Sequence, residues 1–163
     1  MEILKRQRHQ QVSIFHASNR KTKSLFLIDS SSDWTWCSTG TTVAGTGVAG
    51  NLITQLSGPY YVFVDSNNAL YIADTGNHRI SKWTSGSMTG TVIAGQVYPQ
   101  AGSNLSLFNQ PYGIYIDSAR NMYVADTNNH RVMLWNNSAT SGIVVAGNGK
   151  KKSQKNPLYA HNF

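Results

Sequence analysis

The chain has 163 residues, of which 40% are hydrophobic, 10% aromatic and 13% charged, with a formal net charge of +7. This length and composition suffice for a buried core, and one domain is the default expectation. No segment reaches the roughly 18–20 apolar residues of a membrane-spanning helix, so no membrane partner is expected. The single cysteine, Cys37, excludes an internal disulfide and a zinc module built on several thiolates.

The positive charge lies at the two ends of the chain. Residues 1–24, a basic N-terminal segment, and residues 150–163, a basic tail, hold ten of the fourteen basic residues. Residues 25–149 hold four basic and six acidic residues, a net charge of −2. This balance disfavours RNA as a partner, because phosphate binding requires a basic face. No apolar stretch follows the basic N-terminus as in a signal peptide, so a cytoplasmic location is expected.

Residues 25–57 are expected to form a degenerate partial unit and a linker. The stretch SLFLID at 24–29 has strand character, and WTWCSTGTTVAG at 34–45 matches the end of a unit that recurs later in the chain. The following GTGVAG at 45–50 has the glycine spacing of a dinucleotide-binding loop. It follows a strand instead of opening a helix, which argues against that function.

A long internal repeat dominates the rest of the sequence. Residues 59–95 align with 111–147 without a gap, and 16 of the 37 aligned pairs are identical. Apolar pairs that differ, such as Val62 and Ile114, are close in volume, and such swaps preserve a packed core. We therefore expect one repeat with its linker at 58–109 and a second repeat at 110–149.

Each copy predicts four short strands in an antiparallel meander. In the second copy the strands are expected at 112–117, 121–126, 130–135 and 142–147, with turn residues in every gap. A sheet of this kind is apolar on both faces and must be covered by neighbouring sheets. Stacking of such units is the physical basis of a β-propeller blade, so the fold class is all-β.

The most closely repeated stretch is ADTGNHRI at 73–80 and ADTNNHRV at 125–132. We interpret it as a structural turn motif in which the aspartate accepts backbone N–H groups of the turn and pairs with the arginine five residues later. Gly76 and Asn128 are expected to hold a left-handed position, because glycine and asparagine take positive φ most readily. A ligand or metal role of the two histidines is the alternative. The motif comprises Asp74, Thr75, Asn77, His78 and Arg79 in the first copy and Asp126, Thr127, Asn129, His130 and Arg131 in the second.

A candidate binding surface lies in the segments that connect the strands and repeats, because exposed aromatic rings and amides make good recognition surfaces. Leu105, Leu107 and Phe108 of the long linker are instead expected to pack as a clasp between the repeats. The candidate surface residues are Tyr60, Tyr98, Asn104, Asn109 and Tyr112.

DTGNHRI and DTNNHRV, preceded by GPYYVFVDSNNALYIA and QPYGIYIDSARNMYVA, resemble NHL repeats, the family named for Asn-His-Leu. Arg79 and Arg131 stand at the third letter of the name. The resemblance covers about 42–149 and implies an NHL-type β-propeller, usually six-bladed when complete, that binds proteins, RNA or peptides. NHL propellers recur in TRIM-type and malin-like ubiquitin ligases, and an NHL-like propeller forms the peptide-amidating lyase.

The sequence accounts for about two and a half to three blades, whereas closed propellers have about four to eight. After Gly147 it parallels the stretch that begins at Gly45, as if a further repeat were starting. Three explanations remain open: the chain is a fragment of a longer protein, two copies associate to complete a propeller, or an open arc persists. Association would cover strand edges that otherwise invite aggregation.

The function expected from the sequence is that of a non-catalytic module that binds a protein partner. No catalytic residue, cofactor or metal site is expected, because no pair of carboxylates, nucleophile–base set or phosphate-binding loop is recognisable. Substrate recognition in a ubiquitin-ligase pathway, with no RING in this chain, and RNA binding are the alternatives.

Overall fold

The computed structural model describes residues 41–149. The basic segments at 1–24 and 150–163, the stretch 24–29 and Cys37 lie outside this range, as does most of the expected N-terminal unit. The first repeat contains β1 (Tyr61–Val64), β2 (Leu70–Asp74), β3 (Arg79–Trp83) and β4 (Thr91–Ala94). The second contains β5 (Pro111–Ile116), β6 (Met122–Asp126), β7 (Arg131–Trp135) and β8 (Ile143–Ala146).

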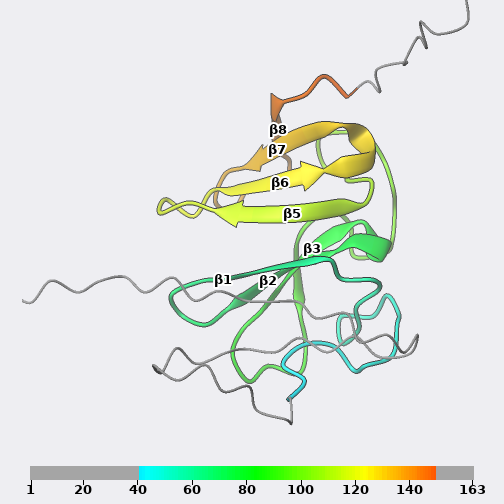
Figure 1. Cartoon of the computed structure of the whole chain (residues 1–163), viewed down its shortest axis with the longest axis vertical. Coiled ribbons are helices and arrows are strands. Elements are labelled where there is room, and N and C mark those ends of the chain that lie inside the picture. Colours follow the sequence, from blue (N-terminus) through cyan, green and yellow to red (C-terminus); the bar gives the residue numbers. More distant parts are fainter. Residues whose placement is uncertain (1–40, 150–163) are drawn as a thin grey trace, which may run out of the picture.

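Each repeat is a four-stranded antiparallel meander in which neighbours in sequence are neighbours in the sheet. The all-β class and the four strands predicted for each copy are confirmed, with ends that differ from the prediction by one residue. The two sheets are stacked face to face, the first shown in green and the second in yellow to orange (Figure 1). They have the form of two consecutive propeller blades.

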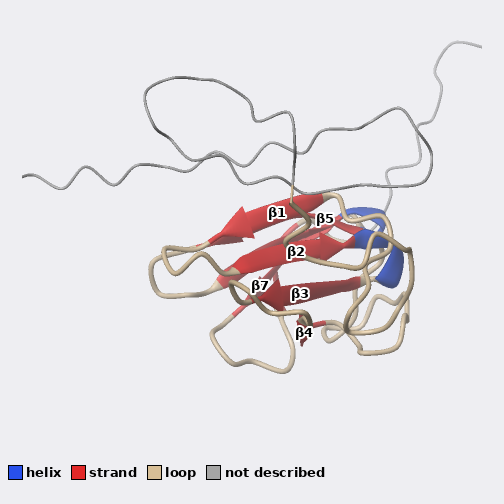
Figure 2. Ribbon diagram, turned by 90° about the horizontal axis from the view of Figure 1, so that it is seen from below, coloured by secondary structure: helices blue, strands red, loops and turns tan. Residues whose placement is uncertain are grey.

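One-turn 3₁₀ helices, η1 (Thr75–Asn77) and η2 (Thr127–Asn129), connect the second and third strands of each sheet. Both lie at the same end of the stacked sheets, as Figure 2 shows in blue. We call this the motif end. The opposite, hairpin end carries the turns at 65–69 and 117–121, which connect the first and second strands of each sheet.

Aspartates form the turns at the hairpin end. Asp65 Oδ1 accepts the N–H groups of Asn67 and Ala69, each at 2.9 Å. Asp117 Oδ1 accepts the N–H of Asn121 at 2.8 Å. The side-chain and backbone hydrogen bonds from Asn121 hold the pKa of Asp117 below its usual value of 3.8.

The larger hydrophobic core spans both sheets. Phe108 of the linker is fully buried in this core, and Leu107 beside it is 5% exposed, as the clasp prediction requires. The prediction is wrong for Leu105, which is 47% exposed and contributes to the fold through its carbonyl, which accepts the Gly142 N–H. The buried residues of this core are Ala73, Ile80, Ala94, Phe108, Ile114, Met122, Val124, Met133 and Trp135.

The opposite face of the first sheet has a core of its own. Val62, Leu70, Ile72 and Trp83 are buried there, and the partly buried Val43, Ala44, Leu56 and Val64 pack against them. Linker residues thus cover this face of the first sheet, as Phe108 covers the other. Within residues 41–149, no helix is long and apolar enough to cross a membrane.

The outermost strands of the two sheets differ in burial although their sequences match. Ala94, the last residue of β4, is 3% exposed because the second repeat covers it. The aligned Ala146, the last residue of β8, is exposed, as are the other three residues of that strand. The repeat sequence therefore builds the same surface twice, and only the first copy is covered within residues 41–149.

Candidate functional site

The repeated turn motif lies where β2 ends and β3 begins. Asp74 is the last residue of β2, Thr75–Asn77 form η1, and Arg79 opens β3 opposite Asp74 in the sheet register. This placement brings the carboxylate and the guanidinium together, since antiparallel partners face each other across the hairpin. Arg79 Nε donates to Asp74 Oδ2 at 2.8 Å, so the pair predicted from the spacing of five residues is confirmed.

Asp74 does not bond the backbone of its own turn, and the Asx-turn prediction is wrong. Its Oδ1 accepts the N–H of Ser57, seventeen residues earlier, at 2.7 Å. Its Oδ2 accepts Asn77 Nδ2 and Arg79 Nε, each at 2.8 Å. The carboxylate therefore joins the linker that precedes the blade to the turn inside the blade.

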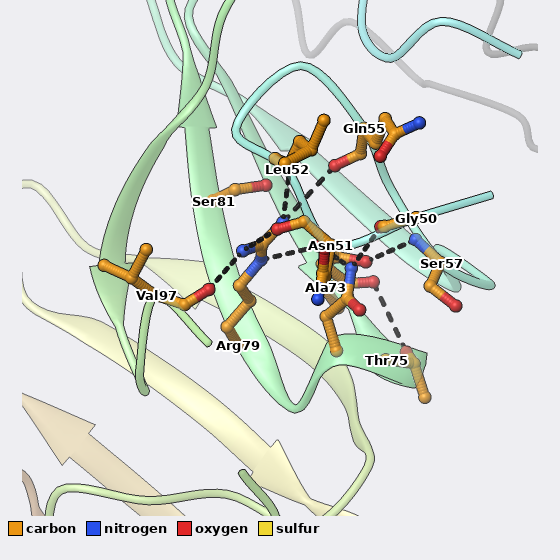
Figure 3. Close-up of polar contacts among 12 residues, drawn as sticks. Gly50, Asn51, Leu52, Gln55, Ser57, Ala73, Thr75, Arg79, Ser81 and Val97 are labelled. Carbon is orange, nitrogen blue, oxygen red and sulfur yellow. Dashed lines mark hydrogen bonds and ion pairs between the residues drawn. The ribbon is translucent and has the colours of Figure 1, made fainter. Parts of the chain in front are cut away.

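Arg79 extends this connection to the linkers on both sides of the first blade (Figure 3). Its Nη1 donates to the carbonyl oxygens of Asn51 at 2.9 Å and Val97 at 2.7 Å. Its Nη2 donates to those of Leu52 at 3.1 Å and Gln55 at 3.3 Å. The side chain is 1% exposed, so these acceptors replace water around a buried cation.

Burial raises the pKa of Asp74 above its usual value of 3.8, because removal from water disfavours the charged form. The hydrogen bonds from Ser57, Asn77 and Arg79 and the charge of Arg79 act in the opposite direction. The carboxylate thus depends on its donors to stay ionised. A catalytic acid or base needs a proton position open to a substrate, and these carboxylate contacts are already used by the fold.

The second copy repeats the arrangement. Asp126 accepts the Asn109 N–H at 2.7 Å and pairs with Arg131 Nε at 2.8 Å. Asn129 Nδ2 donates to Asp126 Oδ2 and to the Gly102 carbonyl. Arg131 Nη1 donates to the linker carbonyl of Ser103, and Nη2 donates to those of Asn104 and Leu107.

The left-handed residue of the motif is the histidine, and the prediction for Gly76 and Asn128 is wrong. His78 has φ 56° and His130 has φ 51°. Gly76 instead lies close to the linker, where a Cβ would be 2.6 Å from Ser57 Oγ and 2.8 Å from Ser57 O. The Ser57 carbonyl accepts the Gly76 N–H at 2.8 Å, as the Asn109 carbonyl accepts the Asn128 N–H at 3.0 Å in the second copy.

Two motif side chains of the first copy contact the second blade. Thr75 Oγ1 donates to the Pro111 carbonyl at 2.7 Å, and the Gln110 N–H donates to His78 Nδ1 at 3.1 Å. The matching Thr127 and His130 are exposed, and Thr127 Oγ1 donates only within its own blade, to the carbonyl of Ala125. The motif of the first copy thus bonds the following blade as well as the linker that precedes its own blade.

Tyr60 and Tyr112 of the candidate binding surface come together. Their rings stack at the motif end, with centroids 4.3 Å apart and planes 16° apart. Tyr98 is 80% exposed in the linker that follows β4. Asn104 and Asn109 serve the fold through their backbones, since the Asn104 carbonyl accepts Arg131 and the Asn109 N–H bonds Asp126.

The linker carbonyls that complete the site could not be predicted from the sequence, because any residue type can supply a carbonyl. Each linker contains a loop that a parallel bridge closes, and the two loops have the same span, from Ala49 to Leu56 and from Ala101 to Phe108. Among residues 41–149, no group of three or more His, Cys, Asp or Glu side chains could hold a metal ion. The motif histidines are thus not brought together with further metal ligands in this range.

Comparison with known proteins agrees with this geometry. The family model for the NHL repeat matches residues 62–83 and 108–132, one segment in each sheet. A stretch of 70 residues is 39% identical to NHL repeat-containing protein 2 from Bos taurus. The match covers 40% of the chain and only 10% of that relative, so the chain spans a small part of the length of the protein it matches.

Proposed function

Since this chain belongs to the NHL-repeat family by its two matched repeats, we propose that it is a non-catalytic module that binds a protein partner through the loops at the motif end. The buried Asp–Arg pairs act in this proposal as structural elements that fix the linkers. They leave the exposed loop side chains between them for recognition, as rigid scaffolds commonly do.

The stacked pair of Tyr60 and Tyr112 is the observation that carries the proposal. One ring comes from each repeat, and Tyr60 keeps 53% of its surface exposed. Tyrosine supplies a large contact area and a polar hydroxyl, and it is enriched among the residues that dominate binding energy at interfaces. The proposed binding surface also includes Tyr98 in the linker that follows β4.

RNA is the competing ligand, because bases also stack on aromatic rings. Residues 41–149 carry four basic and four acidic side chains, and Arg79 and Arg131 are held in buried ion pairs. Little positive charge is left there to neutralise phosphates. The balance favours a protein surface over a nucleic acid at the tyrosine pair.

Photo-crosslinking tests this proposal. A benzophenone amino acid placed at position 60 is expected to give protein adducts in a cell extract, and a Tyr112→Ser substitution should abolish them. The same group at Met88, which is 84% exposed and lies away from the tyrosine pair, serves as the control. Adducts that equal those of the Met88 control, or that disappear on ribonuclease treatment, would contradict a protein-binding role.

A further inference from the structure

The cations in residues 41–149 divide into two kinds. Arg79 and Arg131 are buried and paired with Asp74 and Asp126. Lys82 and Arg120 form no ion pair in this part of the chain. Both of these unpaired cations line one cavity of about 300 Å³.

This cavity lies between the two sheets at the hairpin end, away from the tyrosine pair. Lys82 is the second-last residue of β3, and Arg120 lies in the turn between β5 and β6. The loop at 136–139, which follows β7, contributes amide and hydroxyl groups to the rim. The volume is at the lower end of the range for ligand pockets and suits one or two side chains of a peptide.

Local structure fixes the Lys82 ammonium and the backbone of Arg120 at this place. Lys82 Nζ lies over the Tyr71 ring, 5.1 Å from its centroid, and such a contact is electrostatically favourable. Arg120 has φ 65°, and its N–H closes the turn by donating to the Asp117 carbonyl at 3.0 Å. No carboxylate lines the cavity. Asp65 and Asp117 nearby are bonded to their own turns, Asp65 also accepting the Tyr71 hydroxyl.

The wall of the cavity combines apolar surface with a tryptophan whose indole N–H is buried beside Gly142. Ile93, Ile116, Met122 and Trp135 line it, and Trp135 Nε1 is the only buried side-chain polar atom without a hydrogen-bond partner among the residues described. In the first repeat the matching Trp83 Nε1 donates to Ser81 Oγ at 3.2 Å. Met133 stands at the position of that serine and provides no comparable acceptor.

We propose that this cavity binds an acidic segment of a protein partner, with a carboxylate between Lys82 and Arg120 and an apolar neighbour against Trp135. Two unpaired cations beside an apolar wall complement a side chain pair of this kind. Nucleic acid fits less well, because two cations would neutralise only about two phosphates. The site lies at the opposite end of the strands from the tyrosine pair and so goes beyond the proposed function.

Selection from a library of random dodecapeptides displayed on phage tests the site. The wild-type chain is expected to enrich peptides that carry Asp or Glu next to a large apolar residue. The double variant Lys82→Gln, Arg120→Gln, checked for folding by circular dichroism, should lose this enrichment. Selection of peptides without acidic enrichment by the wild-type chain would overturn the proposal.

Fluorescence anisotropy with the best selected peptide gives the affinity. We expect a loss of at least about tenfold in the double variant, and a similar loss when the acidic residues of the peptide are changed to their amides. The variant Tyr60→Ser, Tyr112→Ser should bind the peptide unchanged, which separates this site from the proposed function. In an amide spectrum, the indole N–H signal of Trp135 should shift on binding.

Two further probes test which class of anionic ligand occupies the site. Glutarate and a labelled twelve-nucleotide RNA should both bind far more weakly than the peptide. Equal binding of glutarate would overturn the peptide assignment in favour of a small acid, and equal binding of the RNA would overturn it in favour of a nucleic acid. A peptide affinity unaffected by Lys82→Gln and Arg120→Gln would place the binding elsewhere.

Discussion

At the scale of single residues, the arginine of the repeated motif holds the linkers in place. Arg79 has five N–H donors in a planar fork, and they bond an aspartate and four carbonyl oxygens. A lysine presents a single ammonium and cannot reproduce this geometry. The identity of the residue, and not only its charge, is therefore required.

We predict that Arg79→Lys lowers the free energy of unfolding by more than about 2 kcal/mol, because it leaves carbonyls and a carboxylate without donors in a buried place. Arg120→Lys, on an exposed turn, should change it by less than about 0.5 kcal/mol. Urea denaturation of both variants measures the difference. Equal losses would mean that the linker contacts of Arg79 contribute little.

The left-handed backbone at the motif histidines gives a second prediction. His130 is exposed and has φ 51°, where a β-branched side chain is strained. His130→Val should therefore cost about 1–2 kcal/mol, whereas His130→Asn should be nearly neutral. Thermal unfolding distinguishes them, and an equal effect of the two substitutions would argue against the left-handed assignment.

The Asp–Arg pair could be predicted from the sequence, whereas the other contacts of the motif could not. The pair is local, because five residues across one hairpin place the two side chains together. The bond from Ser57 to Asp74 joins residues that are distant in sequence, and no residue type marks its position. The prediction for Gly76 failed for the same reason. Glycine is found both where φ is positive and where another backbone approaches closely, and only the position of Ser57 shows that the second applies.

At the scale of the elements, each sheet is recognisable from sequence because strand alternation and turn residues are local signals. What covers each sheet cannot be predicted in this way, since equivalent strands in the two copies have different neighbours. The aligned Ala94 and Ala146 end β4 and β8, yet only Ala94 is buried. The pattern of a repeat thus predicts the blade but not which of its faces is occupied.

This difference makes a matched pair of substitutions informative. Ala94→Leu should destabilise the chain by about 1–3 kcal/mol, because extra volume does not fit a packed core. Ala146→Leu should change the stability by less than about 0.5 kcal/mol. Chemical denaturation of the two variants under the same conditions compares them. A large cost for Ala146→Leu would show that another segment covers β8 in solution.

The tryptophan of the second blade tests the core between the sheets. Trp135 is 3% exposed and belongs to the core cluster that both sheets share. Trp135→Ala should cost about 3–5 kcal/mol. Met88→Ala, at a position that is 84% exposed, is the control and should have little effect. A loss below about 1 kcal/mol for Trp135→Ala would contradict its burial between the blades.

At the scale of the whole molecule, two blades are held together by three kinds of contact. The shared core lies between the sheets, and Thr75 and His78 bond the start of the second blade. Aromatic contacts also join the two blades. The Tyr60 ring stacks on that of Tyr112, and the ring centroids of Phe63 and Tyr115 are 6.3 Å apart. Stacked repeats of this kind gain stability from nearest-neighbour interfaces, so the pair should unfold as one unit.

The central claim is that the two repeats pack face to face as consecutive blades, and nuclear Overhauser effects between their rings test it most directly. In the full chain, cross-peaks are expected between the rings of Tyr60 and Tyr112 and between those of Phe63 and Tyr115. The contact of Phe63 with Tyr71 inside the first sheet serves as the reference. Cross-peaks within the sheet without those between the repeats would contradict the account.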